Sequence, residues 1–125
     1  MLDPIVETFD GIILANTTQK REQLHSDNQH ETGGLSGRPL FERNLELISY
    51  AYKQTNGQFL IIGTGGIFNT SDVITMMRHG ASLVQLYSAL VFEGPGLLKK
   101  LNQYLAKYLQ TEGYEHINDI IGIYV

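Results

Sequence analysis

The chain has 125 residues with a formal net charge of -4 at pH 7, and 42% of its residues are hydrophobic, which is ordinary for a water-soluble globular domain. Its 13 acidic residues outnumber 9 Lys and Arg residues, which argues against general nucleic-acid binding, and the lack of cysteine excludes disulfides, thiolate metal sites and a cysteine nucleophile. No apolar run approaches the roughly 20 residues that span a bilayer and the acidic N-terminus is unlike a signal peptide, so we expect a soluble, cytoplasmic chain.

Three short apolar runs predict strands, at residues 11–15, 59–63 and 82–87. Each run is nearly continuous rather than alternating between apolar and polar residues. This texture is typical of parallel strands that are covered on both faces or closed into a barrel.

Helical periodicity lies between and after these runs. One helix that ends near residues 55–57 is predicted by apolar residues that share a helical face: Phe41, Leu45, Ile48 and Tyr52. A second helix is expected to begin at residues 69–70, where Asn69 or Thr70 can cap it, and to end at residue 80. A third follows Pro95 with a stripe of apolar residues at three- and four-residue steps: Leu97, Leu98, Leu101, Tyr104, Leu105, Tyr108 and Leu109. The tail at residues 113–122 has room for one further turn.

This order of elements indicates an α/β fold with a parallel sheet and right-handed crossovers. Three strands alone leave both sheet edges bare, so we expect further strands to precede them in the fold. Residues 16–40 have no apolar period, and a connection of about 25 residues is typical of a binding loop or of disorder. In (β/α)8 barrels the active site lies on loops after the strands, and phosphate typically sits on those after the last two. The glycine-rich loop after the second run therefore suggests that these runs are strands 6 to 8 of such a barrel.

Two glycine-rich stretches follow predicted strands. In "GTGGI", residues 63–67, missing side chains expose backbone N–H groups and free the φ and ψ angles, as a phosphate-binding loop requires. The alternative interpretation is a tight turn between a strand and a helix. For residues 32–37 the alternative is a flexible linker. The four histidines show no metal-binding spacing, so we expect no metal site.

Four motifs in register identify a resemblance: "ANTT", "ETGGLSGRPL", "IIGTGGI" and "GASLVQLYSALVFEGPGL". Together, over roughly residues 10–122, they closely resemble the C-terminal part of class 2 dihydroorotate dehydrogenases, the quinone-linked branch of that family. The resemblance implies a flavoprotein with an FMN-binding (β/α)8 TIM barrel that oxidises dihydroorotate to orotate in pyrimidine biosynthesis. It also implies hydride transfer to FMN, electron transfer to a quinone and a parent enzyme bound peripherally to the cytoplasmic side of the inner membrane. Residues 1–125 would then be the C-terminal fragment of one barrel domain.

The resemblance assigns site residues by position. Gly37, Gly66, Tyr87 and Ser88 match FMN-contacting positions, and Gly65 belongs to the same cradle, where backbone N–H groups of Gly65, Gly66 and Ser88 would hold the phosphate. Ala15 stands where the family usually has a flavin-contacting threonine, so it keeps the backbone contact and loses the hydroxyl. The match assigns the substrate's ring and carboxylate to Asn16 and Thr17.

In the family, the catalytic serine base, a flavin-binding lysine and the membrane- and quinone-binding helices lie upstream of the matched part. No catalytic residue is therefore assigned in this chain, and we expect the isolated chain to be inactive. Two alternatives stay open. One is part of another FMN- or phosphate-binding TIM-barrel oxidoreductase. The other is a non-catalytic fragment that forms a dimer or a swapped oligomer, because bare strand edges and an uncovered barrel-facing surface are costly in a monomer.

Overall fold

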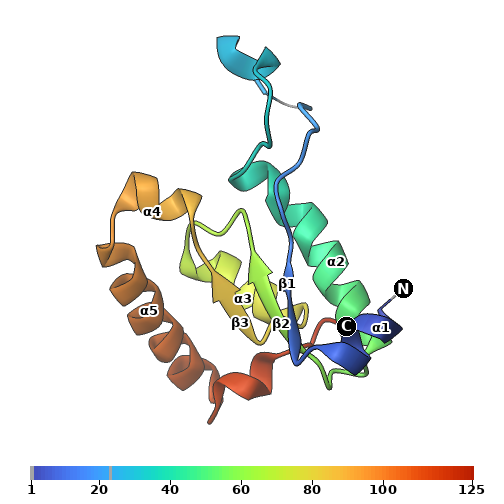
Figure 1. Cartoon of the computed structure of the whole chain (residues 1–125). Helices are drawn as coiled ribbons and strands as arrows, with labels where there is room; N and C mark the ends of the chain where they lie inside the picture. Colours follow the sequence, from blue (N-terminus) through green and yellow to red (C-terminus); the bar gives the residue numbers. More distant parts are fainter. Residues whose placement is uncertain (1, 23) are drawn as a thin grey trace.

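A parallel sheet of three strands forms the centre of the computed structural model, which describes residues 2–22 and 24–125 (Figure 1). The strands are β1 (Gly11–Leu14), β2 (Leu60–Thr64) and β3 (Leu83–Gln85), and they lie in the order β1-β2-β3. Ile62 of β2 is in register with Ile13 of β1 and with Leu83 of β3. The three predicted strands and their parallel arrangement are confirmed. Met1 and Gln23 lie outside the described residues.

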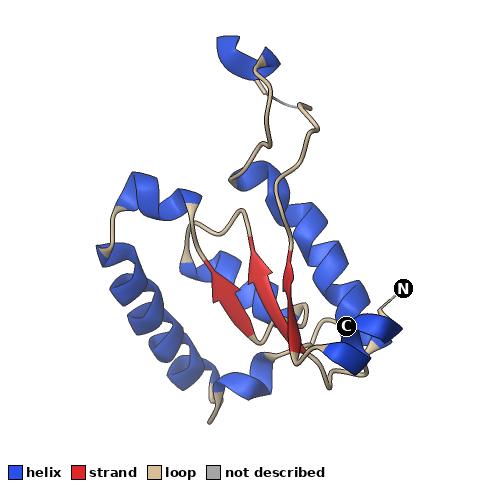
Figure 2. Cartoon of the chain, viewed as in Figure 1, coloured by secondary structure: helices blue, strands red, loops and turns tan. Residues whose placement is uncertain are grey.

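Helices alternate with the strands along the chain (Figure 2). The three predicted helices are confirmed as α2 (Phe41–Gln54), α3 (Thr70–Arg78) and α5 (Gly96–Glu112). Two helices of six residues, α1 (Asp3–Thr8) and α4 (Ser88–Glu93), are additions that the periodicity does not predict. Short 3-10 turns occupy Asp27–His30, Arg38–Leu40 and Ile117–Ile120. The last of these is the further turn for which the tail has room.

The start of α3 shows why this segment becomes a helix. The side chain of Asn69 accepts a hydrogen bond from the backbone N–H of Asp72 at 2.9 Å, and the Asp72 carboxylate accepts one from the N–H of Asn69 at 3.2 Å. This reciprocal capping box satisfies donors that the first turn leaves without an intrahelical partner. The predicted capping role of Asn69 is confirmed.

The core lies between one face of the sheet and the helices. Ile48 of α2, Ile61 of β2 and Met76 of α3 are fully buried there, as is Ile120 of the last 3-10 turn. Beyond that turn, the N–H groups of Gly122 and Tyr124 donate to carbonyls of residues 77 and 78, so the tail packs on the C-terminal end of α3.

The opposite face of the sheet is open. Ile13, Leu60 and Leu83 are 54%, 40% and 54% exposed, and the strand register places Ile13 and Leu83 in line across Ile62. The continuous apolar texture predicts cover on both faces or closure into a barrel, but within the described residues helices cover only one face. We call Ile13, Leu60, Ile62 and Leu83 the open face.

The long loop of residues 16–40 doubles back on itself and projects beyond the sheet (Figure 1). Thr18 and Leu35 form an antiparallel bridge with hydrogen bonds of 3.0 and 2.7 Å, and Arg21 donates to the carbonyls of Thr18 and Gly33. The bridge brings the two ends of the loop together beside the sheet. Among residues 2–22 and 24–125, no helix has the length and apolar character required to span a bilayer.

Candidate functional site

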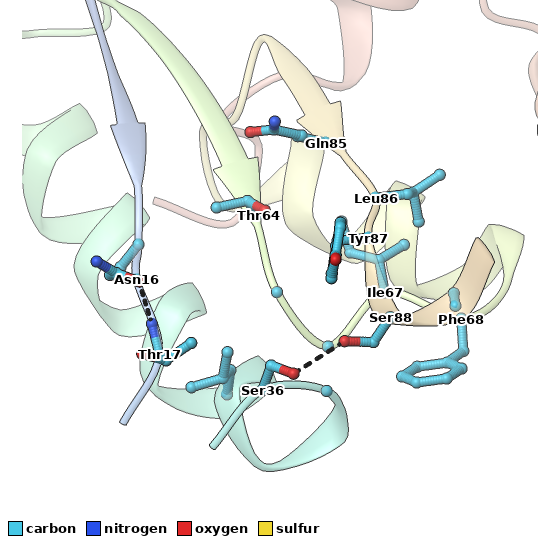
Figure 3. A pocket seen from close by; sticks show the side chains of 16 residues that line it. Asn16, Thr17, Ser36, Thr64, Ile67, Phe68, Gln85, Leu86, Tyr87 and Ser88 are labelled. Atoms are coloured by element: carbon cyan, nitrogen blue, oxygen red, sulfur yellow. Dashed lines mark hydrogen bonds between the residues drawn. The ribbon is translucent and has the colours of Figure 1, made fainter. Parts of the chain in front are cut away.

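A pocket of about 210 Å³ lies at the carboxyl ends of the three strands (Figure 3). Its lining comes from segments 15–17, 36–40, 64–68 and 85–89, which are far apart in the sequence. Carboxyl ends of neighbouring parallel strands meet at one edge of a sheet, which is the usual ligand site of α/β folds. All of the residues assigned from the sequence line this single pocket: Ala15, Asn16, Thr17, Gly37, Gly65, Gly66, Tyr87 and Ser88.

The turn after β2 requires glycine for two reasons. Gly65 and Gly66 have φ angles of 95° and 79°, a region that favours glycine. A Cβ on Gly66 would also lie 2.7 Å from the Cβ of Phe41, and one on Gly65 would lie 2.7 Å from Nδ2 of Asn44. The turn therefore packs directly against α2, so the tight-turn interpretation describes part of its role.

The same turn presents its backbone to the pocket. Within the part of the chain that the structure describes, the N–H of Gly66 donates no hydrogen bond, and neither does the N–H of Ser88, the first residue of α4. The backbone donors around the start of α3 differ, because side chains accept from the N–H groups of Phe68 and Asn69 before the helix and of Asp72 in its first turn. An anion in this pocket would thus meet the glycine turn rather than the capped end of α3.

Two serines that sequence reasoning did not pair connect the loops across the pocket. The hydroxyl oxygens of Ser36 and Ser88 are 3.1 Å apart, which joins the loop before Gly37 to the start of α4 (Figure 3). Ser36 lies in the "ETGGLSGRPL" motif, so its neighbour Gly37 was the available signal. Gly37 itself has a φ angle of 86°, and a Cβ there would meet no atom within 4 Å.

The end of β1 carries the two residues assigned to the substrate. The Asn16 side-chain oxygen accepts a hydrogen bond from the backbone N–H of Thr17 at 2.7 Å (Figure 3). A Cβ on Gly34 would lie 2.6 Å from the Cβ of Thr17, so the glycine-rich stretch packs closely on this strand end. That contact and the Thr18–Leu35 bridge speak against the linker interpretation of residues 32–37.

The pocket lining is uncharged and combines polar with apolar side chains. Its side chains are amides, hydroxyls and apolar groups, and none of the lining residues is Asp, Glu, His, Lys or Arg. Ligands would be held by neutral donors and acceptors, and the lining supplies no carboxylate or imidazole base. Among the described residues, no three His, Cys, Asp or Glu side chains gather as metal ligands would.

A buried amide supports the glycine turn from behind. Asn44 of α2 is 2% exposed, and its side-chain Nδ2 donates to the carbonyl of Thr64, the last residue of β2. Sequence reasoning missed this contact. The available signal was a polar residue within the apolar stripe that runs from Phe41 to Ile48.

An ion pair lies outside the pocket lining, next to residues that form it. Arg38 and Asp72 form two hydrogen bonds of 2.9 Å each, from Nη1 to Oδ1 and from Nη2 to Oδ2. Hydrogen bonding to Asp72 raises the pKa of Arg38 above its usual value. The two residues are 34 positions apart in the sequence, and no spacing rule predicted the pair.

Comparison with known families gives one match over most of the chain. The family model described as "Dihydroorotate dehydrogenase" matches residues 3–109. This range contains every residue that lines the pocket.

Individual relatives agree with that match. Proteins named dihydroorotate dehydrogenase (quinone) are 45% identical over 112 residues in Deinococcus radiodurans and 46% identical over 115 residues in Parvibaculum lavamentivorans. These alignments cover 90% and 91% of this chain but 30% and 33% of the relatives, so the chain spans about a third of the length of the curated relatives it matches.

A solved structure shows the same similarity in three dimensions. The crystal structure of ligand-free DHODH from Eimeria tenella is 41% identical and superposes with a TM-score of 0.89 on 97% of this chain and 34% of its own. The fold is therefore α/β with a small parallel sheet, consistent with part of a TIM barrel as the sequence predicted.

Proposed function

Since this chain belongs to the dihydroorotate dehydrogenase family, we propose that it forms the C-terminal, FMN-phosphate-binding part of an enzyme that oxidises dihydroorotate to orotate. A quinone is the proposed final electron acceptor, and the whole enzyme is proposed to lie on the cytoplasmic side of the inner membrane. The observation that carries the proposal is the meeting of four separate segments in one pocket, with all of the assigned residues in its lining.

The lining fits the phosphate end of FMN. The N–H groups of Gly66 and Ser88 are available to an acceptor, and hydroxyls of Ser36 and Ser88 lie beside them. Backbone N–H groups arranged around a turn favour an anion without a side-chain charge. The open space at Gly37 allows a ligand to approach that backbone closely.

The pocket is smaller than a complete cofactor site. Its volume of about 210 Å³ is below the roughly 300 to 1,000 Å³ of typical small-molecule sites. We propose that it holds one end of the cofactor and that other strands of the barrel complete the remainder. When bound, FMN would accept the hydride that the substrate gives up.

On the substrate side, Asn16 and Thr17 are proposed to orient the ring and the carboxylate with amide and hydroxyl groups. The pocket lining contains no carboxylate, imidazole or amine that could take the proton that the substrate loses besides the hydride. We therefore propose that these 125 residues by themselves do not turn over dihydroorotate.

The direct test is a titration of the chain with FMN, followed by flavin fluorescence, with inorganic phosphate as a competitor. Ser88→Glu places a carboxylate in the phosphate cradle and should weaken FMN binding by about tenfold or more through like-charge repulsion. Gln103→Glu adds the same charge on an exposed position of α5 and should leave the affinity unchanged. Equal effects of the two variants, or no competition by phosphate, would contradict binding of the FMN phosphate in this pocket.

The activity is tested in a chimera in which this chain replaces the matching third of the Deinococcus radiodurans relative. We expect a yellow protein that oxidises dihydroorotate with a quinone. A colourless, inactive chimera that still folds would overturn the proposal. A yellow chimera without dihydroorotate turnover would favour another FMN-dependent TIM-barrel oxidoreductase.

A second candidate role concerns the chain in isolation, and the open face is the observation that favours it. Ile13, Leu60 and Leu83 expose 40% to 54% of their surfaces on one side of a sheet whose edges are β1 and β3. Exposed apolar patches and unpaired strand edges promote association. We propose that the isolated chain self-associates through this surface.

A further inference from the structure

Two loops of the pocket are joined behind it by one carboxylate. Asp72 lies in the first turn of α3, directly after the glycine turn, and Arg38 directly follows Gly37. The two hydrogen bonds of 2.9 Å form a parallel, two-pronged contact between the guanidinium and the carboxylate. The Asp72 side chain is 11% exposed, whereas the Arg38 side chain is 51% exposed.

The same carboxylate also holds the backbone that leaves the glycine turn. Oδ2 of Asp72 accepts from the N–H of Phe68 at 2.8 Å and from the N–H of Asn69 at 3.2 Å. One side chain thus bonds the Arg38 side chain and the segment that begins at Gly66. Moving the two loops apart would strain these hydrogen bonds.

Aromatic rings fix the position of the guanidinium. Its carbon lies 5.3 Å from the ring centroid of Phe41 and 5.3 Å from that of Phe68. Phe41 is the residue against which Gly66 packs, and Phe68 lines the pocket. Arg38 is therefore held between the two sides that it connects, by cation–π contacts as well as by hydrogen bonds.

Neither Arg38 nor Asp72 lines the pocket, and two guanidinium nitrogens of Arg38 are engaged by Asp72. This geometry therefore does not favour a direct contact between Arg38 and the phosphate. We propose that Arg38 and Asp72 are a positioning pair that sets the distance between the backbone at residues 36–37 and the glycine turn at residues 65–66. The inference rests on the proposed function, because it assigns both loops to one phosphate.

A purely structural role makes a different prediction. If Asp72 acts only as part of the cap of α3, loss of Arg38 should leave the capping box with Asn69 in place and should not alter the glycine turn. If the pair positions the loops, loss of the two-pronged contact should loosen both loops together.

The key variant is Arg38→Lys, which keeps the charge but cannot form the two-pronged contact. We expect the dissociation constant for FMN to rise about tenfold, and hydrogen exchange to accelerate by a similar factor at residues 36–38 and 66–69 together. Arg43→Lys is the matched control, because Arg43 forms an exposed pair with Glu46 on α2, and it should change neither quantity.

Asp72→Asn, alone and combined with Arg38→Lys, completes a double-mutant cycle in which the two changes should be strongly non-additive in FMN affinity. Unchanged exchange at residues 36–38 and 66–69 in Arg38→Lys, or additive effects, would overturn the positioning role. If the unmodified chain fails to bind FMN, the proposed function fails, and the exchange measurements still decide whether Arg38 and Asp72 couple the two loops.

Discussion

Gly63 lies in β2 at a point where Ile48 of α2 and Met76 of α3 pack against the strand. A Cβ at this position would lie 2.7 Å from Cγ of Met76 and 3.0 Å from Cδ1 of Ile48, both of which belong to fully buried residues. The absence of a side chain therefore serves packing rather than backbone conformation. The two helices approach β2 because this residue occupies so little space.

We predict that Gly63→Ala destabilises the chain by about 1–3 kcal/mol, since the added methyl forces Met76 from its position. Urea unfolding of the wild-type chain and the variant measures the difference. Gly96→Ala is the control, because a Cβ at Gly96, the first residue of α5, would meet nothing within 4 Å. A neutral Gly63→Ala would show that the Met76 side chain moves aside without cost.

His79 makes the stability of the chain depend on pH. Burial lowers the pKa of His79 below its usual 6.5, and its Nδ1 lies 2.8 Å from the Ser49 hydroxyl of α2. The folded state thus binds a proton less readily than the unfolded state does. Stability from this residue is fully present above about pH 6.5 and is lost as pH falls through the folded-state pKa.

We accordingly expect the urea midpoint of the wild-type chain to fall as pH is lowered from 7 to 5, and to fall less steeply in His79→Asn. Asn retains a polar group near Ser49 but cannot gain the charge. His25→Gln, at an exposed position, should keep the wild-type slope. A His79→Asn variant with an unchanged slope would assign the pH dependence to other groups.

At the scale of elements, α3 depends on a cap that can be altered separately from its core contacts. Asn69 is exposed, and its side chain accepts a hydrogen bond from the N–H of Asp72 in the first turn. Asn69→Ala should cost about 1 kcal/mol of unfolding free energy, whereas Asn69→Ser should retain most of the stability. Equal losses in the two variants, measured by urea unfolding, would contradict a capping role.

The elements that sequence reasoning predicted are those with a strong local pattern. The stripe in α2 and the cap of α3 are written in consecutive residues, so both helices could be predicted. The helix α4 was missed because its residues 89–92 are all apolar, and Val91 and Phe92 remain 73% and 77% exposed, so no amphipathic period marks it. The helix α1 has only six residues, too few for a period to be visible.

The candidate site was predictable to the extent that strand ends meet at one edge of a parallel sheet and that the motifs resemble a known family. This placed residues such as Asn16 and Gly66 correctly in one pocket. The Ser36–Ser88 contact and the Arg38–Asp72 pair were missed because they depend on how loops of separate βα units fold toward one another. No local spacing encodes such contacts.

At the scale of the whole molecule, the open face should control the association state. We predict that light scattering of the isolated chain gives a mass above that of the monomer, and that the double variant Ile13→Lys and Leu83→Lys shifts it toward the monomer. Tyr104→Lys is the control, because Tyr104 is 61% exposed but lies on α5. A wild-type chain that is monomeric at all concentrations would refute the prediction.

The assembly of one pocket from residues as far apart as Ala15 and Ala89 has a thermodynamic consequence. A ligand that contacts all four segments binds only the state in which β1, β2 and β3 are paired, so occupancy and unfolding compete for the same population. At a ligand concentration of about 100 times Kd, this linkage adds about 2.7 kcal/mol to the free energy of unfolding. A rise in melting temperature on addition of a ligand would therefore show that the three strands are paired. Chains whose strands are only partly paired would show no such rise.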